Sequence, residues 1–139
     1  MPSLEDSATA HVDGAARGNP GPAGLGVVFE AGGRVEKYRE YLGRMTNNQA
    51  EYHALIKALE IALTRGVRRL KVFTDSQLLA KQVNEEYKVR SPGLKPLHAK
   101  VVDLTSRLEM FEIKYVGREE NAEADRLANE AIDRAMRRP

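Results

Sequence analysis

The sequence predicts an α/β protein built on a mixed β-sheet, because its hydrophobic pattern changes period part-way along the chain. Three short alternating segments joined by turns come first, which is typical of antiparallel hairpins. Helical segments then alternate with two further strands, and crossovers of this length favour parallel pairing. The expected order is β-β-β-α-β-α-α-β-α.

Five segments have the residue pattern of strands. They are residues 9–13, 25–31, 35–43, 69–75 and 111–117. Between the first two lies most of the stretch HVDGAARGNPGPAGLG (11–26), which holds five glycines and two prolines. This composition predicts a flexible loop that follows a strand ending at Asp13.

Four segments have helical periodicity, namely residues 46–66, 76–86, 97–111 and 121–136. The first is the clearest, because Leu55, Leu59 and Leu63 recur every four residues and define one apolar face. Thr46, or an asparagine after it, can cap the start of this helix, and Gly66 ends it.

Length and composition indicate one globular domain over residues 1–139, with residues 1–7 expected to be flexible. The chain has no cysteine, which excludes disulfides and thiolate zinc sites. It has no long apolar run and no secretory pattern at residues 1–10, so we expect a cytoplasmic protein without a membrane span. The net charge of +2 permits a polyanionic partner.

Four acidic residues break the expected burial pattern. Asp13 and Asp75 each close a strand, whereas Glu51 and Asp125 lie on the apolar side of a helix near its start. In open α/β sheets, ligands bind outside the carboxyl ends of strands, where the following helices begin. The four carboxylates are therefore expected to meet there.

Buried carboxylates without a cation are costly, and oxygen-only ligation suits Mg²⁺ first and Mn²⁺ second. Each acid alone can equally be a helix-capping or dipole-stabilising group, but four together favour a metal site. The sequence has no phosphate-binding GxxxxGK[ST] loop, HExxH pattern or GxSxG elbow. Its histidines, His11, His53 and His98, are scattered and suit ordinary core or surface positions.

Four motifs together resemble type 1 ribonuclease H: VDGAARGNPGPAGLG, TNNQAEYHALIKALE, VFTDSQLL and NAEADRLAN. They occur in order over residues 8–135. The resemblance implies a ribonuclease H-like fold, with a five-stranded mixed sheet of three antiparallel and two parallel strands and helices on both faces. It also implies an endonuclease that hydrolyses the RNA strand of RNA/DNA hybrids with two metal ions, leaving 5′-phosphate and 3′-hydroxyl ends.

Matched to this family, the catalytic metal ligands are Asp13, Glu51, Asp75 and Asp125, and Asp13 bridges both ions. The flexible loop would bring backbone against the sugar edge of the RNA, where the 2′-hydroxyl distinguishes RNA from DNA. The matched substrate-binding positions are Gly14, Arg17, Asn19, Arg44, Thr46, Asn47, Asn48 and Gln49.

The sequence departs from better-known relatives at two places. Arg118 stands where they carry a histidine in a mobile loop, and arginine cannot shuttle protons near neutral pH. It can stabilise phosphate charge or aid product release, or simply be a solvated turn residue. A basic protrusion is also missing, since only KVRSPGLKP (88–96) remains in its place, as in a short prokaryotic subgroup.

Three functions stay open from the sequence: a hybrid-specific endonuclease, a binding module without catalysis, and a nuclease for another duplex. Double-stranded RNA is a conceivable side substrate of a monomeric enzyme. Because the protrusion is missing, the basic end of the last helix, with Arg134, Arg137 and Arg138, is a candidate for phosphate contacts. Solvated surface is the alternative for these arginines.

Overall fold

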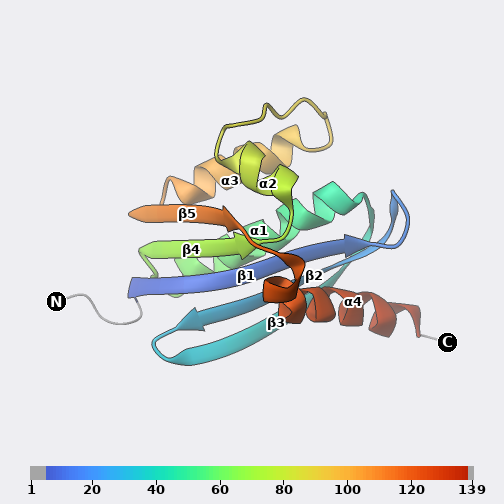
Figure 1. The fold of residues 1–139 in the computed structure, drawn as a ribbon, viewed down its shortest axis with the longest axis horizontal. Coiled ribbons are helices and arrows are strands. Elements are labelled where there is room, and N and C mark those ends of the chain that lie inside the picture. Colours follow the sequence, from blue (N-terminus) through green and yellow to red (C-terminus); the bar gives the residue numbers. More distant parts are fainter. Residues whose placement is uncertain (1–5, 138–139) are drawn as a thin grey trace.

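The computed structural model describes residues 6–137 and contains one five-stranded sheet (Figure 1). Its strands are β1 (Ser7–Ala16), β2 (Gly21–Ala31), β3 (Arg34–Met45), β4 (Arg69–Thr74) and β5 (Met110–Tyr115). They lie in the order β3-β2-β1-β4-β5. The first three pair antiparallel, and β4 pairs parallel to both β1 and β5. The predicted mixed sheet and its element order are confirmed.

Helices cover both faces of the sheet, as predicted (Figure 1). They are α1 (Asn47–Thr64), α2 (Gln77–Val83), α3 (Lys95–Thr105) and α4 (Ala122–Met136), with a short 3-10 helix, η2 (Arg118–Asn121), before the last. Helix α4 packs on β2 and β3 from one side, and α1 lies across β1 and β2 on the other. No helix within residues 6–137 combines the length and the apolar character that a bilayer crossing requires.

Helix α1 is buried on more sides than its leucine spacing predicted. Thr46 accepts a hydrogen bond from the Gln49 backbone, and the Gln49 side chain accepts one from the Thr46 backbone, which forms a capping box. Buried residues surround much of the helix, including Leu55, Leu59 and Ile61. The reason is that α1 lies between the sheet and α3. Leu63, predicted on the same apolar face, is only partly buried.

The prediction that the first strand ends at Asp13 is wrong. Strand β1 continues to Ala16, and Gly14 pairs with Leu25 of β2. The flexible loop expected over residues 14–24 shrinks to a turn at residues 17–20. Asp13 therefore lies inside β1, where it pairs with Gly26 of β2 on one side and directly follows Val12, the last residue of β1 that pairs with β4.

Two of the glycines in this stretch serve close helix packing. A Cβ on Gly14 would lie 2.2 Å from the carbonyl carbon of Ala50, at the start of α1. A Cβ on Gly26 would lie 2.2 Å from the carbonyl oxygen of Ala124, at the start of α4. Atoms cannot approach so closely, so any larger residue would push a helix off the sheet. The glycines thus bring both acid-bearing helix starts near Asp13.

Other boundaries shift by a few residues. The third predicted helix ends at Thr105 instead of residue 111, because β5 already begins at Met110. The second ends at Val83. Of the N-terminal segment expected to be flexible, residues 1–5 lie outside the described residues, whereas Ser7 is the first residue of β1 and pairs with Arg69. Arg138 also lies outside the described residues.

Candidate metal centre

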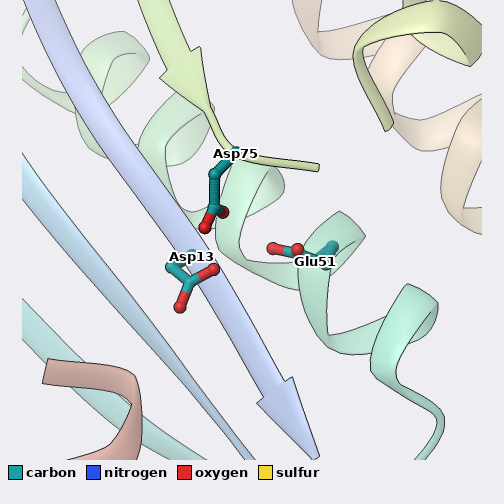
Figure 2. Close-up of side chains that lie close together, drawn as sticks. All are labelled: Asp13, Glu51 and Asp75. Carbon is teal, nitrogen blue, oxygen red and sulfur yellow. The ribbon is translucent and has the colours of Figure 1, made fainter. Parts of the chain in front are cut away.

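Three carboxylates from three different elements meet at the centre of the sheet (Figure 2). Asp13 comes from β1, Glu51 is the fifth residue of α1, and Asp75 directly follows β4. One oxygen of each lies within 4.8 Å of the others. The parallel register, in which Val12 pairs with Thr74, places Asp13 beside Asp75. The three acids thus lie together as the sequence predicted, and their role as metal ligands stays a prediction.

The cluster is shielded from water. Asp13 is 4% exposed and Glu51 is 6% exposed, and the Asp75 side chain is 10% exposed. The backbone N–H of Gly14 donates a hydrogen bond of 2.7 Å to Oε1 of Glu51. This bond fixes Glu51 against β1, and it also occupies the Gly14 N–H, which we had expected to face the substrate.

Asp125 lies at the edge of the group. It is in the first turn of α4, is half-buried, and is not one of the three acids whose oxygens lie within 4.8 Å of each other. The Asn129 side-chain amide donates to its Oδ1 over 3.3 Å. Its carboxyl group is close enough to Asp13 to contribute to the pKa shift of that residue. Asp125 is therefore placed to close the site from the side of α4.

The surroundings strongly favour a protonated Asp13 when no cation is bound. Burial is the largest cause and, with the charges of Glu51 and Asp75 and hydrogen bonding to Asp125 and Asp75, raises the pKa of Asp13 to about 10. A carboxyl group this far from its ordinary pKa lacks a positive partner. A divalent cation would supply that charge and displace the proton.

The pKa of Glu51 is raised in the same way, but less than that of Asp13. Burial raises its pKa to about 8, and the charges of Asp75 and Asp125 act in the same direction. The hydrogen bond from Gly14 and the charge of Arg118 oppose this rise. Within residues 6–137, no lysine or arginine forms an ion pair with Asp13 or Glu51.

Arg118 reaches the outer side of the cluster. It begins η2, and its Nε lies 3.8 Å from Oδ2 of Asp75. Its side chain is 90% exposed, so the contact is loose and the guanidinium remains open to solvent. The position expected from the sequence thus lies at the mouth of the site, and its role stays a prediction.

Asn121 is a residue of the site that was not predicted from the sequence, where it only marked the start of the last helix. Asn121 is 1% exposed, and its Nδ2 donates to the Val12 carbonyl over 2.8 Å and to Oδ1 of Asp75 over 3.3 Å. Its own Oδ1 is buried without a hydrogen-bond partner among the described residues. Asn121 therefore links β1, Asp75 and the start of α4. A polar residue directly before an acid-bearing helix was the available signal.

The predicted substrate contacts fall into two groups. The first group is exposed along the β1–β2 turn, the end of β3 and the start of α1, and consists of Asn19, Arg44, Asn47 and Asn48. The Asn47 N–H donates to Oδ1 of Asn19 over 3.1 Å. The side chains of the other group already bond to other residues of the protein.

In that second group, Thr46 and Gln49 form the cap of α1. The Arg17 guanidinium lies 2.7 Å from Asp133 and thus ties the turn to α4.

The fold and its acidic centre are those of a reverse transcriptase-like domain, and the family model of that description matches residues 11–131. "Ribonuclease H" of Methylococcus capsulatus is 36% identical over 152 aligned residues, covering 98% of this chain and 96% of that protein. The chain therefore belongs to the ribonuclease H family.

Other relatives are longer than this chain. "Ribonuclease HI" of Halobacterium salinarum is 43% identical over 128 residues, which is 91% of this chain and 64% of the relative. "Bifunctional protein Rv2228c" of Mycobacterium tuberculosis is 39% identical over 88% of this chain but only 35% of its own length. This chain thus spans between about one third and two thirds of these curated relatives.

Solved structures agree with the fold. The crystal structure of RNase H1 from Halobacterium salinarum superposes with a TM-score of 0.88 at 41% identity, covering 92% of this chain and 98% of that one. LC11-RNase H1, solved in complex with an RNA/DNA hybrid, superposes with a TM-score of 0.86 at 41% identity, covering 93% and 99%.

Proposed function

We propose that this chain is an endonuclease that hydrolyses the RNA strand of RNA/DNA hybrids with divalent metal ions, leaving 5′-phosphate and 3′-hydroxyl ends. The observation that carries the proposal is the buried cluster of Asp13, Glu51 and Asp75, which has the ligands of a metal centre and no strong protein cation. The substrate class is supported by LC11-RNase H1, which binds an RNA/DNA hybrid.

The donor set fits magnesium. All of its atoms are carboxylate oxygens, and hard cations such as Mg²⁺, with Mn²⁺ as substitute, prefer such ligands. Asp13, Glu51 and Asp75 would hold the metal, and Asp125 would complete the site from α4. Two bound ions would lower the pKa of the attacking water and neutralise the departing oxygen.

The chain's own residues orient these ligands. The Gly14 N–H holds one oxygen of Glu51 and so fixes this carboxylate beside β1. Asn121 holds Asp75 against β1, and Asn129 holds Asp125. Such supporting hydrogen bonds fix ligand geometry and strengthen metal binding. Arg118, at the mouth, provides a mobile positive charge for a phosphate group.

The exposed side chains beside the cluster suit a nucleic-acid groove. Asn19, Asn47 and Asn48 offer amide groups to sugar and base edges, and Arg44 offers a charge to a phosphate. Contacts of this kind recognise the shape of the duplex and the 2′-hydroxyl groups of the RNA, so the enzyme should cleave hybrids of many different sequences. Binding should weaken as salt concentration rises.

A cleavage assay on labelled duplexes tests the proposal. RNA/DNA, RNA/RNA and DNA/DNA substrates would each be incubated with Mg²⁺, Mn²⁺ or a chelator. We expect cleavage of the RNA strand in the hybrid, none with chelator, and weak or no cleavage of double-stranded RNA. Hybrid binding without cleavage in either metal would instead favour a binding module, and cleavage of only another duplex would favour a different nuclease.

A monomeric state and a cytoplasmic location are further parts of this proposal, and both come from the sequence. Sedimentation of the purified chain with and without a short hybrid would test the first. We expect one protein molecule in the free state.

A further inference from the structure

A pocket lies between α2, α3 and the segment that joins them, and the proposed cleavage does not use it. Figure 1 shows this segment as an arch above the two helices. The pocket has a volume of about 430 Å³, which is within the range of small-ligand sites. Gln82, Tyr87, Lys88, Lys95 and His98 are among the residues that line it.

One donor in this pocket is not used within residues 6–137 of the protein and is available to a ligand. Gln82 is 5% exposed, and its Oε1 accepts a hydrogen bond of 2.7 Å from the Tyr52 hydroxyl. Its amide nitrogen has no hydrogen-bond partner among the described residues, although Gln82 lines the pocket. His98 is fixed beside it, because its Nε2 lies 3.3 Å from the Gln82 carbonyl. Because this nitrogen is not one of the described buried atoms that lack a partner, it is open to the pocket and available to an acceptor that enters it.

The charges around the pocket favour an anion. Lys88 and Lys95 are exposed and form no ion pair with any residue in 6–137. Lys95 opens α3, which has no side-chain cap and no acid in its first turn, so the partial positive charge of the helix end adds to that of the lysines. Glu85 is the one acid among the lining residues that the structure describes.

The remaining groups suit a nucleoside. Tyr87 is 51% exposed and lies beside Lys81, whose Nζ is 4.9 Å from the ring centroid. A half-exposed ring of this type can stack with a base. The Glu85 carboxylate can accept hydrogen bonds from ribose hydroxyls, as acidic residues do in dinucleotide sites.

We infer that this pocket binds a phosphorylated nucleoside, with the phosphate on Lys88 and Lys95, the Gln82 amide donating to it, and the base against Tyr87. The ligand can be a free mononucleotide or the 5′-phosphorylated end of a nucleic-acid strand. The pocket is separate from the acidic cluster but connected to it, since Tyr52, which contacts Gln82, directly follows Glu51.

The test is a titration of the metal-free protein with adenosine 5′-monophosphate, followed by calorimetry and by the amide resonances of Gln82. Chelator removes binding through metal ions, so the result does not depend on the proposed cleavage activity. We expect saturable binding and a shift of the Gln82 side-chain signal. Adenosine and inorganic phosphate should each bind at least about tenfold more weakly, because each lacks one set of contacts.

Matched variants locate the ligand. Gln82→Glu keeps the acceptor for Tyr52 but removes the amide donor and adds a negative charge, and Lys95→Ala removes an exposed cation. Each should weaken binding by about tenfold or more. Arg34→Ala removes one positive charge at the β2–β3 turn, away from the pocket, and should leave affinity unchanged within about twofold.

Titration with a dinucleotide that carries a 5′-phosphate distinguishes the two possible sources of the ligand. Tighter binding than that of adenosine 5′-monophosphate would support a strand end, and weaker binding would support a free mononucleotide. Absence of saturation up to about 10 mM would overturn the inference. Equal affinity for inorganic phosphate, or unchanged binding in both pocket variants, would also overturn it.

Discussion

Acidic residues on the outer side of α4 and acidic residues at the centre of the sheet have opposite surroundings. Outside, Glu130 lies 2.8 Å from Arg39, and hydrogen bonding to Arg126, followed by that to Lys37, lowers the pKa of Glu123. At the centre, Asp13 and Glu51 are buried with raised pKa values. The outer acids are therefore neutralised by basic side chains of the protein, whereas Asp13 and Glu51 have no such ion-pair partner among the described residues.

This difference separates structural from functional carboxylates. Exposed ion pairs such as Glu130–Arg39 fasten α4 to the sheet, and each contributes about 0–1 kcal/mol. Unpaired buried carboxylates oppose folding, and the fold tolerates them only where surrounding packing is strong. A carboxylate that is costly to the free protein and lies beside two others has the surroundings that we propose for a metal ligand.

The largest predicted effect is on catalysis. Asp13→Asn, Glu51→Gln and Asp75→Asn should each lower hybrid cleavage by about 10³-fold or more, or ~4 kcal/mol in activation free energy, because each removes a metal ligand. Rates under single-turnover conditions with Mg²⁺ would measure this, and circular dichroism would verify the fold.

The matched control is Glu130→Gln, an acid with its own arginine partners. It should retain activity within about twofold and lose at most about 1 kcal/mol of stability. Near-normal turnover by any central variant would remove that residue from the metal site.

The second prediction concerns how the centre is built. Gly14→Ala should destabilise the protein by roughly 1–3 kcal/mol, because its Cβ would collide with the backbone of Ala50. It should also impair cleavage, since Glu51 follows Ala50. Urea unfolding and single-turnover kinetics would measure both effects.

Gly117→Ala is the matched control for this substitution. Gly117 has a φ of −67°, and the nearest atom to its added Cβ lies at 3.7 Å. It should be stable within about 0.5 kcal/mol. Equal stability of the two variants would contradict the close approach of β1 and α1.

The third prediction tests whether the hydrogen bond from Asn121 holds Asp75 in position. Asn121→Ala removes both hydrogen bonds to Val12 and Asp75, and should reduce cleavage and apparent Mg²⁺ affinity by roughly 10–100-fold. Asn129→Ala, at the edge of the group, should have a smaller effect in the same assay. If excess Mg²⁺ failed to restore any activity to Asn121→Ala, its role would lie outside metal-ligand positioning.

The fourth prediction concerns pH in the absence of metal. The folded pKa values of Asp13 and Glu51 lie above their ordinary values, so the folded state binds more protons than the unfolded state. The stability that these two carboxyl groups contribute is therefore fully present below about pH 4 and is lost as the pH rises toward about 8–10. Urea unfolding across pH should show a shallower decline for Asp13→Asn, and a steeper or unchanged decline would contradict the assignment.

The smallest predicted effect concerns the basic end of α4. Arg134 lies beside Arg39 and Tyr41 along a surface pocket, and Arg137 follows the helix. If they contact phosphates, Arg134→Ala with Arg137→Ala should raise the Michaelis constant and reduce the salt slope by about one per lost contact. Unchanged values at two salt concentrations would show that these arginines only solvate the chain end.

Element order and type followed from the sequence, because periodicity and turn residues are local signals. The extent of β1 did not, since pairing of Gly14 with Leu25 depends on a partner strand and on helices that require glycine there. Composition alone made the glycine-rich stretch look flexible. Its glycines instead permit contacts between segments far apart in the chain.

The meeting of the three central acids could be predicted, because Glu51 lies on the apolar face of its helix and Asp13 and Asp75 each follow the apolar residues of a strand. Asn121 could not, because its partners Val12 and Asp75 are 109 and 46 residues away. The pocket beside Gln82 likewise depends on how α2, α3 and their connection fold together. The role of a side chain whose partners lie far away along the chain can be recognised only from the structure.

Proton release on Mg²⁺ binding tests the central claim most directly. Calorimetric titration of the metal-free protein at pH 7, in two buffers of different ionisation enthalpy, gives the number of protons released. We expect net release, because the raised pKa of Asp13 favours a bound proton that a cation would displace, and we expect Asp13→Asn to lower both release and affinity. Tight Mg²⁺ binding without proton release, or equal binding by Asp13→Asn, would contradict this claim.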